Sequence, residues 1–343
     1  MKKKIFAKIK RIRDIISNFF FRDHLITTTK KEILSSEEKN LISNTIWDNS
    51  KEQYQKGNFK IYWELLPAIE KYQMKYITGD ENLNYFVYAI NYTKEKVGDK
   101  NLRGLFIGCI EGNPSPDMSL METGLYSKID VMDIAEGLLK KQRMVASERG
   151  LKEIEYINQD FNKFILERNQ YDVIWAIGTV HHIEKLEHLF DQVQNALKDN
   201  GIFIIREYIG ANRFQYSETQ LKIINEILSI LPEKYKIQED GITVKKNIER
   251  PDIAELIKHD PTESVRSEDI IPLVKERFEI IKLAYTGGTI LHPLLSYIAS
   301  NFERDEDAET ILKLLILFEK TLIDNEVLPS DYVFCIAKKR ICR

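Results

Sequence analysis

The side chains with the clearest chemical use follow two apolar runs of the sequence. Residues 102–107 lead into the small residues Gly108, Cys109 and Gly112, and a second apolar run ends at Asp133. If both runs are neighbouring strands of a parallel sheet, the tight turn and the carboxylate lie at the same carboxyl edge, where doubly wound sheets bind nucleoside ligands. Because a carboxylate can accept hydrogen bonds from both ribose hydroxyls, this spacing predicts a nucleoside-binding site.

Apolar runs that alternate with helical patterns indicate which elements position this site. The predicted strands are residues 102–107, 128–132, 154–157, 171–177 and 201–208, with helical patterns at about 134–149 and 184–198. Two later apolar runs, 278–285 and 331–339, flank a helical pattern at 305–325. This alternation predicts an α/β fold with a doubly wound, mostly parallel sheet that helices cover on both faces.

The chain divides into three predicted regions. These are a basic amphipathic arm at 1–29, a helical N-terminal extension at 30–100 and the main domain at 101–343, with an insertion at about 210–300. Residues 59–77 of the extension have helical periodicity. Residues 240–272 of the insertion are polar and contain three prolines, so we expect irregular structure there.

The arm begins with a strongly basic segment. Residues 1–22 carry eight Lys or Arg and one acid, a net charge of +7. Apolar residues recur at helical spacing on one face, namely Ile5, Ile9, Ile12, Ile16 and Phe19. This pattern is compatible with peripheral contact with an anionic membrane, or with packing of the arm on the body of the protein or on another subunit. Its charges are incompatible with a signal peptide or a spanning helix.

The overall composition excludes several classes of protein. Hydrophobic residues make up 43% and charged residues 30% of the 343 residues, which indicates a soluble globular protein rather than a disordered one. The chain beyond residue 22 carries a net charge of −10, which argues against a nucleic-acid partner. Three scattered cysteines favour neither a disulfide framework nor a metal site, so we expect a cytoplasmic protein, possible membrane contact of the arm being at the inner face.

The order of these motifs resembles class I S-adenosylmethionine-dependent methyltransferases. The matching features are the glycine loop, the acid after the second strand, Asp160-Phe161 after the third and YDVIWAIGTVHHI around the fourth. The resemblance implies a seven-stranded Rossmann-like sheet whose last strand is antiparallel, with S-adenosylmethionine as cofactor and no metal. A dehydrogenase would instead need a phosphate cradle, and Pro114 and Pro116 leave few N–H groups for one.

The resemblance also implies which residues hold the methyl donor. They are Gly108, Glu111, Gly112, Asp133, Ile134, Asp160, Phe161, Ala176 and Ile177. Asp133 would bind the ribose, although it could instead cap the following helix, and Asp160 would bind the adenine, although it could instead make a turn. Two positions depart from the family, because an acid usually stands at Phe106 and a glycine at Ile110. A β-branched residue is costly at positive φ, so we expect the loop to take another path.

Residues after the fourth and fifth strands are the predicted catalytic groups. His181 and His182 follow the fourth strand and titrate in the useful range, and Glu207 ends the fifth. One of them could accept a proton from a hydroxyl nucleophile during in-line methyl transfer. The histidines could alternatively serve only to start a helix.

The insertion and nearby loops supply the predicted substrate-binding residues, Tyr208, Arg213, Arg266 and His292. Together with WELLPAIEKY, these segments are similar to methyltransferases of bacterial cell-surface glycan biosynthesis. That similarity implies O-methylation of a saccharide or glycan intermediate. The alternatives are a small acid, a lipid or a quinone-like metabolite as acceptor, or a donor-binding protein without catalysis. The oligomeric state is not predicted.

Overall fold

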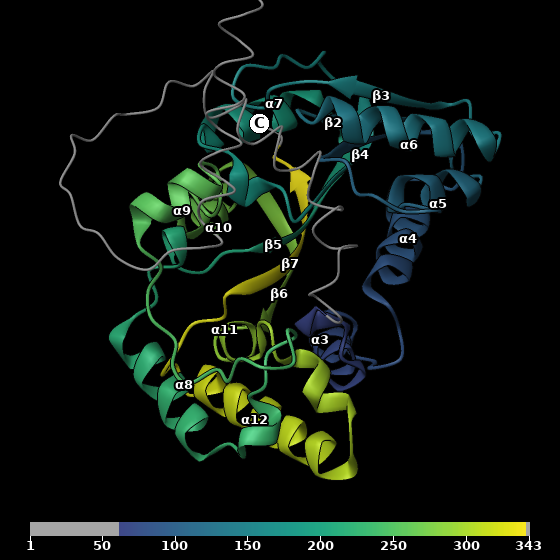
Figure 1. Ribbon diagram of the computed structural model, residues 1–343. Coiled ribbons are helices and arrows are strands. Elements are labelled where there is room, and N and C mark those ends of the chain that lie inside the picture. Colours follow the sequence, from purple (N-terminus) through teal and green to yellow (C-terminus); the bar gives the residue numbers. More distant parts are fainter. Residues whose placement is uncertain (1–61, 341–343) are drawn as a thin grey trace, which may run out of the picture. The chain divides into compact units, whose positions relative to one another are not determined.

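A seven-stranded sheet forms the centre of the part of the chain that the computed structural model describes, residues 62–340 (Figure 1). The strands are β1 (Leu102–Ile107), β2 (Tyr126–Asp133), β3 (Ile154–Asn158), β4 (Tyr171–Ile177), β5 (Leu197–Tyr208), β6 (Phe278–Gly287) and β7 (Tyr332–Lys339). Their order is β3-β2-β1-β4-β5-β7-β6, and β7 runs antiparallel to both of its neighbours. The predicted doubly wound, mostly parallel seven-stranded sheet is therefore confirmed.

Helices pack on both faces of this sheet because its buried strands are apolar on both sides. The helices are α3 (Pro67–Thr78), α4 (Tyr85–Lys96), α5 (Pro116–Glu122), α6 (Glu136–Glu148), α7 (Leu186–Ala196), α8 (Glu218–Ile230), α9 (Ile253–His259), α10 (Ile270–Arg277), α11 (Leu291–Leu295) and α12 (Glu306–Asp324). Alternation along β4 separates the faces: Ile174 packs in the cluster with α7 and α10, and Trp175 in the cluster with α3, α4, α5 and α6.

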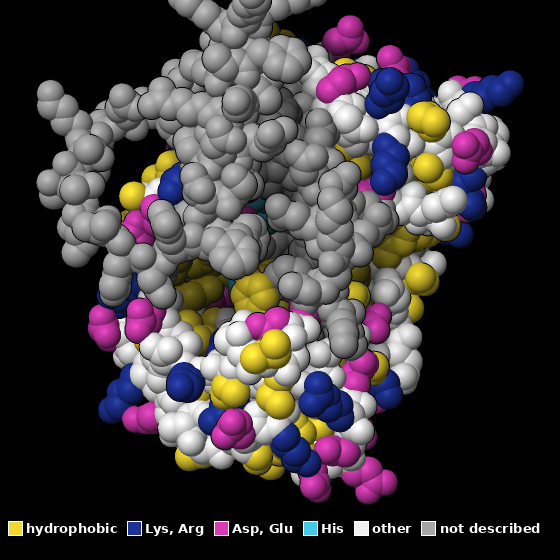
Figure 2. Space-filling model, in the orientation of Figure 1, with side chains coloured by type: hydrophobic (Ala, Val, Ile, Leu, Met, Phe, Trp, Pro, Cys, Tyr) yellow, Lys and Arg dark blue, Asp and Glu magenta, His cyan; other side chains and the backbone are white. Residues whose placement is uncertain are grey.

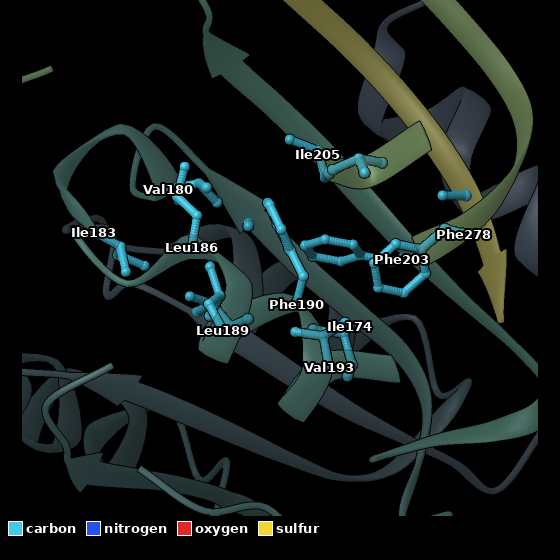
Figure 3. Packing of buried hydrophobic residues seen from close by; sticks show 14 of the residues in the cluster. Ile174, Val180, Ile183, Leu186, Leu189, Phe190, Val193, Phe203, Ile205 and Phe278 are labelled. Atoms are coloured by element: carbon cyan, nitrogen blue, oxygen red, sulfur yellow. The ribbon is translucent and has the colours of Figure 1, made fainter. Parts of the chain in front are cut away.

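Aromatic side chains fill the first of these layers (Figure 3). The ring of Phe190 on α7 lies 6.2 Å from that of Phe203 on β5, which in turn lies 5.6 Å from Phe278 at the start of β6. All three side chains are fully buried. This layer anchors β4 and β5, the two strands whose ends carry the predicted catalytic residues.

A third apolar cluster lies beyond the sheet and contains residues of α3, α8, α11 and α12 (Figure 1). Glu319 on α12 is a buried acid within it. Its carboxylate accepts hydrogen bonds from the backbone N–H groups of Gly288, Ile290 and Leu291, at 2.7–2.9 Å. These bonds fix the turn between β6 and α11, which carries His292. No helix among residues 62–340 is both long and apolar enough to cross a membrane.

The local structure differs from the sequence prediction at several places. The helix expected over 59–77 begins at Pro67, because proline suits the first helical turn and disfavours helix in the residue before it. Helix α9 lies within 240–272, where irregular structure was expected, and Asp252 caps it by accepting from Glu255 N–H. Strand β5 begins at Leu197, and residues 198–201 bulge out where a turn was expected. The basic arm at 1–29 and the first part of the extension lie outside the described residues.

Asp331, immediately before β7, makes the stability of the fold depend on pH. Its side chain is buried, and burial raises its pKa to about 7. In the unfolded chain an aspartate has a pKa of about 3.9. Between these values the folded state binds more protons than the unfolded state, so the free energy of unfolding falls as pH rises, by up to about 1.4 kcal/mol per pH unit. We expect Asp331→Asn to remove this contribution. Urea unfolding of both proteins between pH 4 and 8 measures it, and equal slopes would contradict the assignment.

Candidate functional site

The predicted site residues gather at one edge of the sheet. The carboxyl ends of β1, β2, β4 and β5 meet there, together with the amino end of the antiparallel β7. Strands β2 and β3 lie on one side of β1, and β4 and β5 lie on the other. The strand order therefore reverses between the adjacent strands β1 and β4. Ligands of open α/β sheets bind in the crevice at such a switch point.

The loop after β1 is held close to the loop after β4. Gly108 has a φ of +93°, and a Cβ atom there would lie 2.0 Å from Oγ1 of Thr179. Only glycine therefore fits, for conformational and for packing reasons. Ile110 is not among the described residues with positive φ, so the loop follows a path that tolerates a β-branched side chain, as expected.

The family's usual polar contacts around this loop are replaced. Phe106 is buried and stacks on Trp175, with ring centroids 5.9 Å apart and planes 7° from parallel, so this position belongs to the core. Glu111 forms an ion pair of 2.6 Å with Lys141 on α6. The end of β1 thus offers no carboxylate to a methyl donor. The carboxylate of Glu111, in the loop that follows, is paired with Lys141.

Asp133 at the end of β2 joins two loops of the edge. One carboxylate oxygen accepts from the Cys109 N–H at 2.7 Å, and the other accepts from the Ala135 N–H at 2.8 Å. Asp133 does not cap the following helix, whose N-cap is Ala135; its bond to the Ala135 N–H instead closes a local turn. This arrangement is compatible with ribose binding, because each carboxylate oxygen has a second lone pair. Ile134 lies beside it, half-buried.

The other predicted donor-binding residues lie along the same edge. Asp160 makes the turn that was the alternative to adenine binding, since its Oδ1 accepts from the Asn162 N–H at 2.9 Å. Phe161 is 7% exposed and packs against Phe164, with ring centroids 5.4 Å apart. Ala176 is buried at the end of β4, and Ile177 is half-buried beside it.

Glu207 is a positioning residue, which corrects its predicted role as a catalytic base. Its side chain is fully buried, and one oxygen accepts from the N–H groups of Thr179 and Val180, at 2.6 and 2.7 Å. The other oxygen lies 2.7 Å from Nδ1 of His181. With both oxygens engaged by protein groups, Glu207 orients His181.

Hydrogen bonds fix the orientation of both histidines. The Glu207 carboxylate accepts from Nδ1 of His181, which places the lone pair of the neutral ring on Nε2. Nδ1 of His182 lies 3.2 Å from Oγ1 of Thr262, whose hydroxyl donates to Asp260 at 2.7 Å. The hydroxyl therefore accepts from His182 Nδ1–H, and this ring also carries its lone pair on Nε2.

Negative charges surround the histidine pair. Burial alone lowers the pKa of His181, but Glu207, Glu263 and Asp260 outweigh it and raise that pKa to about 9. Burial and the adjacent His181 cation lower the pKa of His182. Burial raises the pKa of Glu263, but the two histidines outweigh it and hold that pKa below the ordinary value. The site thus favours positive charge at His181.

Arg213 is a structural residue, contrary to its predicted role in substrate binding. Its guanidinium donates to the carbonyl oxygens of Pro261 and Glu263, at 2.7 and 2.8 Å. The Val265 N–H also donates to the carbonyl of His181, at 3.1 Å. Arg213 thus anchors the segment that brings Glu263 to the histidines, and its donors point at the backbone.

Arg266 also pairs with acids of the protein, which argues against the substrate-binding role predicted for it. Its guanidinium forms two hydrogen bonds of 2.7 Å with Glu187 on α7 and one of 2.8 Å with Asp269. The Arg266 hydrogen bonds lower the pKa of Glu187 to about 2. This ion-pair group fastens the insertion to α7, so Arg266 has little capacity left for a ligand.

Tyr208 and His292 do lie close to His181, within a group of rings that we call the aromatic cluster. Its members are Trp63, Tyr208, Phe214, His292 and Tyr332, with neighbouring ring centroids 5.1–6.2 Å apart. The rings of His181 and Tyr208 are 6.3 Å apart. Burial lowers the pKa of His292 to about 4, so its ring is neutral at pH 7. Its Nδ1 and Trp63 Nε1 are buried without a hydrogen-bond partner among the described residues.

Three further residues of the site come from the insertion. Asp260, Thr262 and Glu263 form a short polar run that contacts the histidines from the insertion. The available signal in the sequence was two acids and a hydroxyl around Pro261, but the histidines that they contact lie about 80 positions away.

Charged side chains of both signs are mixed on the described surface seen in Figure 2, so no large basic patch stands out on this face.

Comparison with known proteins gives this edge a family context. Residues 105–205, from within β1 to within β5, match the family model described as a methyltransferase domain. This segment, under a third of the chain, is therefore similar to a methyltransferase domain. The match begins inside the strand that precedes Gly108, and it includes Asp133, His181 and His182. The Rossmann-like methyltransferase fold predicted from the sequence is thereby confirmed.

Curated relatives match parts of the chain only. An N-terminal Xaa-Pro-Lys N-methyltransferase of Xenopus tropicalis is 31% identical over 88 residues, 25% of this chain and 39% of that protein. A sterol 24-C-methyltransferase of Gibberella zeae is 26% identical over 136 residues, 39% of this chain and 35% of that protein. One of Neurospora crassa is 20% identical over 235 residues, 64% and 60% of the respective chains. The chain thus spans between about a third and three-fifths of these relatives.

Solved structures resemble the chain over a longer stretch. The [4+2]-cyclase SpnF has a TM-score of 0.49 at 13% identity, over 92% of this chain and 100% of its own. A phosphoethanolamine N-methyltransferase of Haemonchus contortus has a TM-score of 0.48 at 16% identity, over 91% of this chain and 62% of its own.

Proposed function

We propose that this chain is an S-adenosylmethionine-dependent methyltransferase that methylates an oxygen atom. The observation that carries the proposal is the His181–Glu207 pair, which stands at the end of β4 and β5. Asp133 and the glycine loop stand at the ends of β2 and β1, on the same edge. An acid–base group and the residues proposed to bind the nucleoside thus share one edge of the sheet. The matched methyltransferase domain supports the same assignment.

The residues at the β1–β2 end fit the donor in its main features. Asp133 would accept hydrogen bonds from the ribose hydroxyls, and Gly108 and Gly112 would let the backbone approach the methionine part. The positive φ of Gly108 and its close packing on Thr179 support a fixed, narrow loop there. S-adenosylmethionine supplies a methyl group already activated by its sulfonium. Phe106 provides no polar contact, so the backbone would have to supply it.

His181 is the acid–base group in this proposal. Glu207 holds the Nδ1–H, and in the neutral ring Nε2 can take the proton of an acceptor hydroxyl. Because the pKa of His181 is raised to about 9, the neutral form is the minor one at pH 7 and its share grows as the pH rises. The buried packing of β4 and β5 keeps the ring in place. The protein's main task is alignment, because the oxygen, the methyl carbon and the sulfur must lie in line. A positioned base adds about 10²–10⁴-fold to the rate.

The aromatic cluster supports a ring-shaped polar acceptor, and we propose a saccharide or glycan intermediate. The half-buried rings of Phe214, His292 and Tyr332 offer flat apolar contact, and the neutral His292 ring could also form a hydrogen bond with a hydroxyl group. A quinone-like ring would use the same flat surfaces but fewer polar partners. Membrane contact through residues 1–22 remains a prediction, because these residues lie outside the described ones.

A transfer assay with a panel of acceptors tests this proposal. The full chain is incubated with S-adenosylmethionine labelled in its methyl group and with free saccharides, nucleotide-linked sugars, a lipid-linked glycan, a quinol and a fatty acid. We expect label on a hydroxyl of a saccharide-containing acceptor, and much less with His181→Ala. Labelling of the quinol or fatty acid alone would contradict the saccharide assignment, and labelling of none would count against catalysis.

A further inference from the structure

Three side chains beside the proposed acceptor position can ligate one metal ion. The two histidines of η2 (Val180–His182) and Glu263 of the insertion each offer one ligand atom, and these atoms lie within 4.8 Å of one another. Nε2 of His181 lies 3.7 Å from Oε1 of Glu263. Ligand atoms that share one tetrahedral zinc ion at about 2.0–2.2 Å are roughly 3.4 Å apart. Small side-chain rotations would therefore bring the three atoms to bonding distance.

The hydrogen bonds behind the histidines match the pattern found behind histidines that ligate metals. Ligating imidazoles almost always donate their other N–H to a carboxylate or another oxygen, which fixes the ring and raises its basicity. His181 donates to buried Glu207, and His182 donates to Thr262, which in turn is held by Asp260. Both rings thus have their Nδ1–H engaged and carry their lone pairs on Nε2.

The charge of this group also favours a cation. Three carboxylates, Glu207, Glu263 and Asp260, surround two imidazoles, and no lysine or arginine forms an ion pair with these carboxylates among the described residues. The side chains of His181 and His182 are each 12% exposed and that of Glu263 is 23% exposed, so the group is sheltered but reachable. A divalent ion would neutralise charge that solvent screens poorly.

We propose that His181, His182 and Glu263 bind a divalent transition-metal ion, with Zn²⁺ as the class that the ligands suit best. Two imidazoles and one carboxylate favour zinc over magnesium or calcium, which prefer oxygen ligands. Three protein ligands leave an open position, as in catalytic zinc sites. The metal-independent chemistry expected from the sequence would then not hold.

The use of this ion rests on the proposed function. An acceptor hydroxyl in the open position would have its pKa lowered by the ion, and His181 would serve as a ligand instead of as the base. The binding of the ion itself does not depend on that use. The two claims can therefore fail separately.

Titration of the metal-free full chain with Zn²⁺ and with Co²⁺ tests the proposal, because Co²⁺ reports its coordination through visible absorption bands. We expect one equivalent to bind with a Kd on the order of micromolar or tighter. His182→Ala and Glu263→Gln should each weaken binding at least tenfold, and Glu207→Gln by about 10–100-fold. The matched control is His259→Ala, which removes an exposed histidine at the end of α9.

Two results would overturn the inference. One is absence of metal binding to the wild-type chain, and the other is binding that His182→Ala and Glu263→Gln leave unchanged. Circular dichroism of each variant establishes that it is folded, and the near-isosteric Glu263→Gln keeps the test valid if a histidine variant misfolds. Calorimetry with S-adenosylhomocysteine, with and without Zn²⁺, is run in parallel. Donor binding without metal binding would remove the metal site and leave the proposed function standing.

Discussion

Replacing His181 with alanine is expected to lower kcat by about 10²–10⁴-fold and to leave the affinity for S-adenosylhomocysteine within about twofold. The imidazole stands at the ends of β4 and β5, where Glu207 fixes its orientation, and its hydrogen-bond partner among the described residues is Glu207 and not a residue of the loops after β1 and β2. Single-turnover transfer from labelled donor measures the chemical step, and calorimetry measures donor binding. This effect is expected whether His181 is a base or a metal ligand.

Two comparisons make the His181 result specific. Glu207→Gln keeps the shape of the positioning residue but weakens its hold on His181, so we expect a smaller loss of kcat with unchanged donor affinity. His259→Ala should be neutral in both measurements, because that side chain is exposed on α9. Equal kcat for His181→Ala and wild type would contradict the assignment of this ring to the chemistry.

Replacing Asp133 with alanine is expected to weaken the binding of S-adenosylmethionine and S-adenosylhomocysteine by about 10- to 100-fold, because hydrogen bonds from the ribose hydroxyls would be lost. The carboxylate also holds the N–H groups of Cys109 and Ala135, so the loop after β1 would loosen as well. Calorimetry measures the affinity, and thermal unfolding measures the accompanying loss of stability.

The matched control for Asp133 is Glu136→Ala, which removes an exposed carboxylate from the first turn of the following helix. It changes the charge of the region by the same amount without touching the two loops. We expect its donor affinity to stay within about twofold of wild type. Equal weakening by both variants would show that general electrostatics, and not a ribose contact, explains the effect.

The strands and the donor edge could be predicted because their signals are local. Buried parallel strands are continuous apolar runs, so the ends at Ile107, Asp133 and Ile177 were identified within one or two residues. Parallel connectivity then places those ends at one edge without any knowledge of side-chain contacts. The same reasoning brought His181 to that edge.

The acceptor side was predicted less well because its contacts are long-range. The sequence predicts Arg213 and Arg266 as substrate-binding residues because they are polar and lie in an insertion, but a guanidinium there can instead stabilise the insertion itself. Arg213 binds backbone carbonyls about 50 residues away, and Arg266 binds Glu187 on α7. The position of Glu263 next to His181 depends on this anchored segment and cannot be inferred from the sequence around Glu263.

Glu207 illustrates a further limit of sequence reasoning. Its position at the end of β5 was identified, but its role depends on three donors that the turn after β4 supplies. The sequence indicates which strand end a residue occupies and says little about which partners occupy its lone pairs. That distinction separates an orienting carboxylate from a base.

Calorimetric titration of S-adenosylhomocysteine into the full wild-type chain tests the central claim most directly, since every other step depends on donor binding at the Asp133 edge. The account predicts saturable binding of one equivalent with a Kd on the order of micromolar, and competition with S-adenosylmethionine. Absence of binding at millimolar ligand would contradict it.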